Sequence, residues 1–63
     1  MPHYYVNRNP QDGGEHEVHQ DDICPIPPKP ENRRSLGHFS NCHDAVREAR
    51  KMYSNVDGCA HCC

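Results

Sequence analysis

The scarcity of large apolar side chains most constrains what this chain can fold into. Only eight of its 63 residues are Val, Ile, Leu or Phe, well below the roughly 20% at which disorder becomes a serious alternative. The net charge is only -2, so charge repulsion does not oppose a compact state. A single core of this size supplies on the order of 3–5 kcal/mol. The sequence therefore predicts one small domain, residues 1–63, that needs an additional stabilising link.

Five cysteines and six histidines can supply this link, through a metal ion or through disulfides. The first residues, MPHYYVNRNP, lack the basic and apolar segments of a secretory signal, which predicts a cytoplasmic protein. In that reducing compartment clustered cysteines bind metals more often than they form disulfides, and an odd number fits a pure disulfide framework poorly. A secreted peptide that has lost its signal is the alternative. We expect no membrane-spanning segment, because no apolar run is long enough.

Three segments have the composition of short strands. Residues 3–8 and 15–22 flank a run of turn-forming residues that contains Gly13 and Gly14, which predicts a hairpin. Residues 24–32 hold four prolines and are typical of an extended covering loop, in which we expect Ile26 to turn inward. Residues 33–39 are then expected to form a third short strand.

The most strongly patterned segment predicts a helix. Ser40 is a suitable N-cap, and apolar side chains recur at helical spacing as far as Val56. Gly58 suits a left-handed cap at the C-terminal end. We therefore expect an α+β fold of βββα order, in which a three-stranded antiparallel meander packs on one helix and a Cys-rich C-terminal tail follows. The apolar face of the helix comprises Cys42, Ala45, Val46, Ala49, Met52, Tyr53 and Val56.

This topology determines which cysteines can meet. A helix that starts where the third strand ends returns its C-terminus to the sheet edge where the second strand ends, so the tail approaches Cys24. The C-x-x-C spacing within the tail is that of a zinc knuckle, whose turn lets both sulfurs reach one ion. Zinc binding would contribute directly to folding. We predict a tetrahedral Zn²⁺ whose ligands are Cys24, Cys59, Cys62 and Cys63, with His61 and His3 as alternatives to Cys63.

Two other arrangements of the cysteines remain open. Cys42 lies at the opposite end of the expected helix, about 21 Å from Val56 at 1.5 Å per residue. We therefore expect Cys42 to be a small buried residue rather than a ligand. The alternative to zinc is a disulfide from Cys24 to Cys59 or Cys62, which would close a loop of about 35 residues.

The remaining candidates for chemistry have unsuitable spacing. His16 and His19 lie three residues apart on an expected strand, so they point to opposite faces, and we interpret both as surface histidines. Cys59 and Cys62 follow a helix C-terminus, whereas redox C-x-x-C motifs lie at helix N-termini, where the dipole favours a thiolate. The sequence therefore shows no catalytic set and predicts a protein that is not an enzyme.

The order of short motifs along the chain resembles a group of small uncharacterised bacterial proteins. The shared pattern is YYVN, HEVH, a mid-chain Cys, LGxF, a Cys before Ala-Val, and a GCxxC tail. The resemblance implies a bacterial, cytoplasmic, single-domain protein and brings no assigned activity. Members of the group continue with a further Cys-His pair, so the resemblance leaves the fourth ligand open. The matching positions are Tyr5, Val6, Asn7, His16 to His19, Cys24, Leu36, Gly37, Phe39, Cys42, Ala45, Val46, Gly58, Cys59 and Cys62.

The functional prediction from sequence is a small, non-enzymatic, zinc-stabilised protein that acts by binding another macromolecule. A protein partner is favoured over nucleic acid, because neither half of the chain is strongly basic. The alternative is a thiol-based redox or metal-handling protein, in which Cys62 and Cys63 are exposed and exchange metal or electrons.

Overall fold

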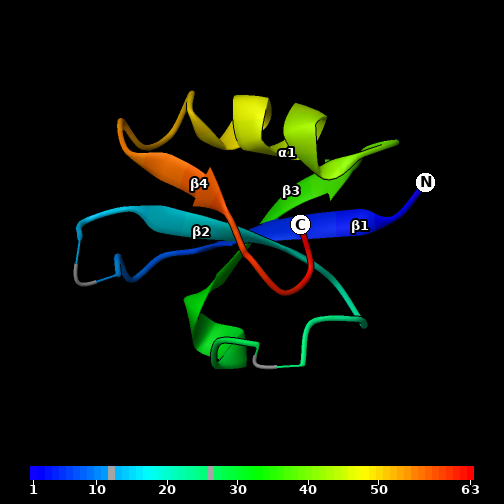
Figure 1. Cartoon of the computed structure of the whole chain (residues 1–63), viewed down its shortest axis with the longest axis horizontal. Coiled ribbons are helices and arrows are strands. Elements are labelled where there is room, and N and C mark those ends of the chain that lie inside the picture. Colours follow the sequence, from blue (N-terminus) through cyan, green and yellow to red (C-terminus); the bar gives the residue numbers. More distant parts are fainter. Residues whose placement is uncertain (12, 26) are drawn as a thin grey trace.

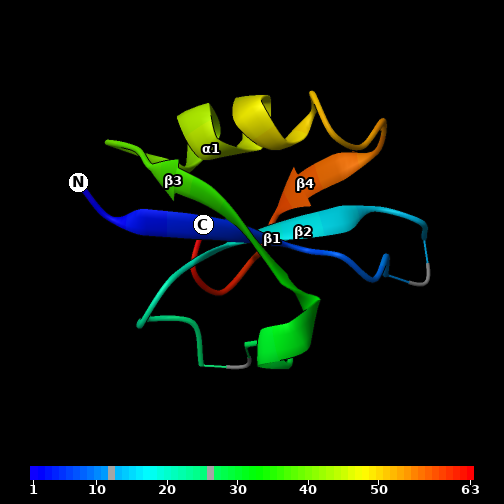
Figure 2. The ribbon, with the colours of Figure 1, turned by 180° about the vertical axis from the view of Figure 1, so that it is seen from behind.

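The computed structural model describes residues 1–11, 13–25 and 27–63. Within these ranges it has a four-stranded sheet covered on one face by a single helix (Figures 1 and 2). The expected α+β class is confirmed. In chain order the elements are β1 (His3–Asn7), β2 (His16–Gln20), a 3-10 helix (Pro30–Asn32), β3 (Arg33–His38), α1 (Cys42–Ala49) and β4 (Val56–Gly58).

The sheet is mixed, with the strand order β3-β1-β2-β4, and the expected three-stranded meander is wrong in this detail. β1 and β2 pair as the antiparallel hairpin that the turn residues indicated. β3 pairs with β1 rather than with β2, because the proline-rich segment is too long for a hairpin and crosses the face of the sheet opposite α1 (Figure 1). The inward orientation that we expected for Ile26 lies outside the described residues.

The helix ends seven residues before the predicted position. Its N-cap is Asn41, one residue after the predicted cap, and the Asn41 side chain accepts a 2.9 Å hydrogen bond from the Asp44 backbone N–H. After Ala49 the chain turns back, and Val56 begins β4, which pairs with β2 in parallel. This pairing satisfies the backbone groups of an otherwise open sheet edge and buries Val56, which a continued helix would not do.

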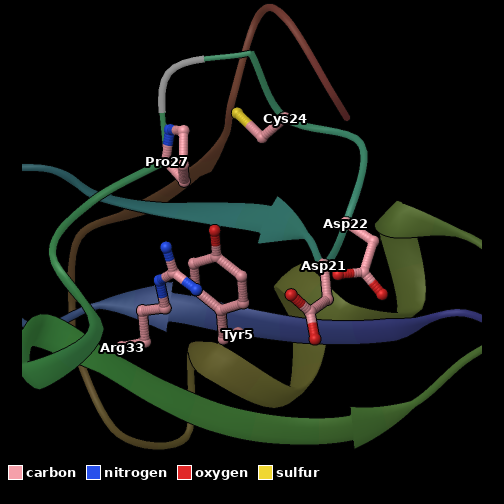
Figure 3. A pocket seen from close by; sticks show the side chains of 6 residues that line it. All are labelled: Tyr5, Asp21, Asp22, Cys24, Pro27 and Arg33. Carbon is pink, nitrogen blue, oxygen red and sulfur yellow. The ribbon is translucent and has the colours of Figure 1, made fainter.

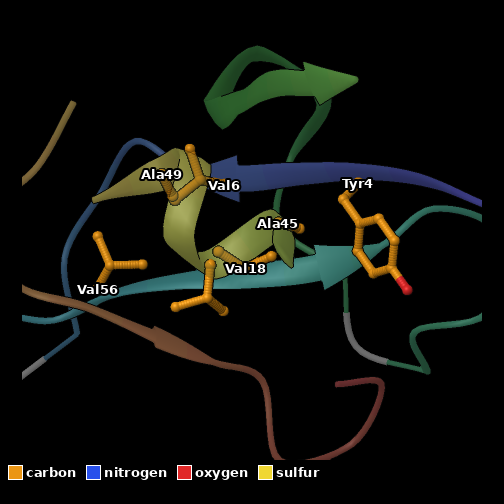
Figure 4. Packing of buried hydrophobic residues seen from close by; sticks show 7 residues of the cluster. Tyr4, Val6, Val18, Ala45, Ala49 and Val56 are labelled. Carbon is orange, nitrogen blue, oxygen red and sulfur yellow. The ribbon is translucent and has the colours of Figure 1, made fainter. Parts of the chain in front are cut away.

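The hydrophobic core lies between the sheet and α1 (Figure 4). Alternation along β1 sends Tyr4 and Val6 to this core and Tyr5 to the opposite face. Tyr5 is nevertheless only 3% exposed, because the proline-rich segment covers that face. Both faces of the sheet are therefore covered at its centre. The core residues are Tyr4, Val6, Val18, Ala45, Val46, Ala49 and Val56.

Two apolar side chains of the predicted helical face, Met52 and Tyr53, follow the end of α1 and differ in burial. Met52 follows the end of α1 and is exposed, so it is not part of a helical apolar face. Tyr53 packs at the edge of the core, with its ring stacked on His16 at a centroid distance of 3.9 Å. Among the described residues, no helix has the length and apolar character needed to cross a membrane.

Candidate metal centre

One imidazole and three thiols converge on the sheet face opposite α1. The potential ligand atoms of His19, Cys24, Cys59 and Cys62 all lie within 4.8 Å of one another. The His19 Nδ1 atom is 3.3 Å from the Cys24 Sγ and 3.6 Å from the Cys62 Sγ. The Cys24 and Cys59 sulfurs are 3.8 Å apart. These four residues are the candidate metal centre.

The topology of the sheet explains why these residues meet. His19 lies on β2 and Cys24 in the turn that follows β2. Since β4 runs parallel to β2, the chain leaves β4 at the same end of the sheet. The Cys59 backbone N–H continues the pairing by donating a 2.9 Å hydrogen bond to the Val18 carbonyl, and the C-x-x-C turn then brings Cys62 alongside. The end of the chain therefore closes over the end of β2.

The turn between Cys59 and Cys62 has the features of a metal knuckle. The His61 backbone N–H lies 3.4 Å from the Cys59 Sγ, and the Cys63 N–H donates to the Cys59 carbonyl at 2.9 Å. These two hydrogen bonds hold the turn closed around Cys59.

Burial disfavours the charged forms of two groups of the centre, His19 and Cys62. Burial lowers the pKa of the His19 imidazole, partly opposed by Glu17, so Nδ1 is available as a neutral ligand. Burial, together with the neighbouring Cys24 thiol, raises the pKa of Cys62 to about 12. Metal ligation requires thiolates, so uptake of a divalent cation releases protons, and its affinity rises with pH.

The distances fit a tetrahedral ion of zinc size. Zn–S bonds of about 2.3 Å at tetrahedral angles place two sulfurs about 3.8 Å apart, and Zn–N bonds of about 2.0–2.1 Å place the imidazole nitrogen about 3.5 Å from a sulfur. The spacings of the Cys24–Cys59 and His19–Cys62 pairs are 3.8 and 3.6 Å. These two pairs match such an ion, and all four ligand atoms lie within 4.8 Å of one another.

The second ring nitrogen of His19, Nε2, is buried and has no hydrogen-bond partner among the described residues. Its nearest carboxylate oxygen is Oε1 of Glu17, at 4.0 Å. Metal ligation through Nδ1 would leave the proton on Nε2, and metal-binding histidines donate that proton to an outer partner. A small movement of Glu17 would supply the acceptor.

Glu17→Gln is expected to weaken the binding of a divalent ion at the candidate metal centre by about ten- to 100-fold, the usual effect of removing an outer-shell carboxylate. Competition with a chromophoric chelator measures this change. Glu31, an exposed residue of the 3-10 helix, provides the matched control, and Glu31→Gln should leave the affinity unchanged. Equal affinities of the two variants would show that Glu17 does not support His19.

Three of the four predicted ligands, Cys24, Cys59 and Cys62, meet in the candidate metal centre. The structure does not bring Cys63 to this group, because Cys63 forms a disulfide with Cys42. Cys42 lies outside the ligand group, as expected, but it is half-buried and disulfide-bonded rather than a small buried apolar residue. That expectation assumed a helix as far as Val56. The early end of α1 and the return through β4 carry the tail back to the start of the helix.

Gly58 has a role that the sequence pattern misassigned. It ends β4 rather than capping a helix. A Cβ at this position would lie 3.0 Å from the Cys63 Cβ and 3.4 Å from the Cys42 Sγ. Gly58 therefore makes room for the disulfide to pack against the sheet edge.

His19 is the functional residue that sequence reasoning missed. It points away from His16, as expected, but it is 3% exposed rather than a surface residue. The H-x4-C spacing from His19 to Cys24, placed across a strand end, is the signal that could have identified it. Of the alternative fourth ligands, His61 is exposed and His3 contacts other partners.

His3 belongs to a second polar cluster on the same face. Its Nδ1 lies 3.2 Å from the Asp21 Oδ2, and its Nε2 lies 2.7 Å from the Ser35 Oγ. The order of groups is that of a Ser-His-Asp hydrolase. Of these three residues, however, Asp21 alone lines the small described pocket beside the candidate metal centre, whose wall comprises Tyr5, Asp21, Asp22, Cys24, Pro27 and Arg33. We therefore assign the cluster a positioning role for Asp21. The expectation that the protein is not an enzyme stays a prediction.

Comparisons with known proteins add no relative: no family, no curated protein and no solved structure matches this chain. The resemblance of its motifs to small bacterial proteins therefore stays a prediction. The assignment of the candidate metal centre depends on the geometry and chemistry of the four residues themselves.

Proposed function

We propose that this protein binds one Zn²⁺ through His19, Cys24, Cys59 and Cys62, and that the ion holds its fold together. The spacing of the sulfur and nitrogen atoms, which matches a tetrahedral ion of zinc size, carries this proposal. The residues of the centre come from β2 and from the two segments that follow β2 and β4. A shared ion would therefore link parts of the chain that a thin core holds together only weakly.

The donor set favours zinc over other common divalent ions. Three thiolates and one imidazole are soft or borderline ligands, which magnesium and calcium avoid. Four protein ligands fill a tetrahedral coordination sphere and leave no position for water, which is typical of structural zinc rather than catalytic zinc. His19, Cys59 and Cys62 are buried, which is consistent with a stabilising role.

Beyond zinc binding, we infer that the protein acts by binding another macromolecule, namely a protein. The inference is supported by the balanced charge of the chain, -2 overall, which does not favour nucleic acid as a partner. A pull-down with the zinc-loaded protein, repeated with the metal-free protein, tests this inference. A partner retained only by the zinc-loaded form is expected, and binding of nucleic acid alone would contradict it.

A second candidate function, metal handling, is supported by one specific observation. Cys24 is partly exposed, whereas the other two thiols of the centre are buried. The sequence-based version of this function expected exposed Cys62 and Cys63, but Cys62 is buried and Cys63 is in a disulfide. Any exchange of metal would therefore proceed at Cys24.

Cobalt substitution tests the ligand set. Co²⁺ in place of zinc should give the intense visible absorption of a tetrahedral thiolate site, with one ion per chain. His19→Ala is expected to change this spectrum and to weaken binding, because it leaves three ligands. The double variant Cys42→Ser/Cys63→Ser should leave the spectrum unchanged. A spectrum that changes in the double variant and not in His19→Ala would show that Cys63, rather than His19, is the fourth ligand.

A further inference from the structure

A small pocket adjoins the candidate metal centre. It has a volume of about 180 Å³, below the roughly 300–1,000 Å³ of sites for drug-sized ligands. It therefore fits a molecule of amino-acid size. Cys24, the partly exposed ligand, forms part of its wall. The lining residues are Tyr5, Asp21, Asp22, Cys24, Pro27 and Arg33 (Figure 3).

Two hydrogen-bond donors in the pocket lack partners. Tyr5 is 3% exposed, and its hydroxyl points toward the segment that carries Cys24 and Pro27 (Figure 3). This hydroxyl makes no hydrogen bond within the described part of the chain. Arg33 donates through Nε to the Pro28 carbonyl at 3.0 Å, while its terminal amino groups form no hydrogen bond or ion pair with the residues described. A hydroxyl that faces the pocket and a planar cation are thus free to bind an acceptor.

The position of Arg33 is well defined. Its guanidinium lies 5.2 Å from the centroid of the Tyr5 ring, and this ring in turn stacks on His19 at a centroid distance of 5.5 Å. Cation–π contact and the bond to Pro28 hold the guanidinium in place. A guanidinium held in this way recognises a carboxylate by two parallel hydrogen bonds.

Besides the positive charge of Arg33, the pocket carries the negative charges of Asp21 and Asp22. Asp21 is held by His3 at 3.2 Å, and Asp22 follows it with a left-handed backbone (φ 70°), a conformation that Asp tolerates better than most residues. A ligand with both a carboxylate and an ammonium group would therefore satisfy both sides of the pocket. The charges match a zwitterionic α-amino acid.

We propose that the pocket binds free amino-acid thiols, the class of cysteine itself, and lets them replace Cys24 on the bound metal. This proposal rests on the zinc site proposed above. The carboxylate pairs with Arg33 and the Tyr5 hydroxyl, and the ammonium group faces Asp21 and Asp22. The bond between the metal and the Cys24 sulfur breaks as a bond to the incoming sulfur forms. The displaced Cys24 sulfur takes the proton that the incoming thiol releases, and no electron is transferred.

The test measures zinc transfer from the loaded protein to a chromophoric chelator in the presence of different thiols. With L-cysteine the rate should saturate, because a bound complex precedes exchange. Cysteamine, which lacks the carboxylate, and mercaptoethanol, which lacks both charged groups, should give slower rates that rise linearly with concentration. Similar linear rates for all three thiols would overturn the proposal.

Substitutions in the pocket test whether the free thiol reaches Cys24 by binding there. Arg33→Gln is expected to lower the rate with L-cysteine by about ten-fold, the usual effect of losing a charged hydrogen bond, and to leave the rate with mercaptoethanol unchanged. Arg34→Gln, at the exposed neighbouring position on β3, is the matched control. Tyr5→Phe keeps the stacked ring and removes only the hydroxyl, with Tyr4→Phe as its control.

Zinc content, measured before each assay, separates the two proposals. A protein that holds no zinc overturns both of them. One zinc per chain, combined with rates that depend on neither the carboxylate nor Arg33, overturns only the exchange route. Equal effects of Arg33→Gln and Arg34→Gln would also overturn it.

Discussion

Cys59→Ser is expected to leave the chain unfolded at room temperature. Structural zinc contributes about 10–16 kcal/mol of apparent binding free energy in small zinc domains, whereas a core of this size supplies only about 3–5 kcal/mol. Cys59 is 2% exposed and is one of the four residues of the ligand group. Loss of this one sulfur should therefore remove the ion and, with it, the folded state. Circular dichroism and one-dimensional proton NMR at neutral pH measure the result.

His61→Ala is the matched control for this prediction. His61 lies within the same C-x-x-C turn, its residue is exposed, and its backbone N–H, rather than its side chain, is directed at the Cys59 sulfur. The variant should fold and bind zinc like the original protein. A folded Cys59→Ser variant with unchanged stability in chelator would show that the metal does not hold the fold together.

Removing the Cys42–Cys63 disulfide should cost about 3 kcal/mol of unfolding free energy, the usual effect of a link across a loop of about 20 residues. The disulfide joins residues 21 positions apart and ties the end of the chain to the start of α1. The variant Cys42→Ser/Cys63→Ser should still bind one zinc, because neither residue belongs to the candidate metal centre. Urea unfolding of the zinc-loaded forms measures the difference.

Chemical reduction of the Cys42–Cys63 disulfide provides an internal check on this second prediction. Treating the original protein with a mild reductant should reproduce the stability of the double variant without loss of zinc. An unchanged urea midpoint in the double variant would contradict a stabilising disulfide. Loss of zinc in that variant would instead return Cys63 to the ligand set.

Local sequence signals predicted those parts of the fold that local interactions determine. The segments of β1, β2 and β3 were recognisable because turn residues and prolines separate them, and the N-terminal half of the helix because its apolar spacing is regular. The approach of Cys24 to Cys59 and Cys62 is inferred from a helix that returns the tail to the end of the second strand. The three cysteines do meet, but β4, which runs parallel to β2, provides the return instead of the helix.

The features that the sequence did not predict depend on contacts between distant segments, which compete with local conformational preferences. Residues as far as Val56 have helical spacing, but pairing of β4 with the open edge of β2 outweighs that local preference. The same change in path brings Cys63 to Cys42 and makes Gly58 a contact of the disulfide rather than a helix cap. His19 was missed because a strand histidine acquires its environment from the segments that cover it, which lie far away in the chain.

In the proposed structure of the loaded protein, one metal ion links β2, the turn after it and the end of the chain. Native mass spectrometry of the cytoplasmically expressed protein, with and without chelator, tests it most directly. We expect the chain to carry one zinc ion and to lose both the ion and its compact charge-state distribution in chelator. A compact, metal-free chain in which Cys24 and Cys59 are joined by a second disulfide would contradict it.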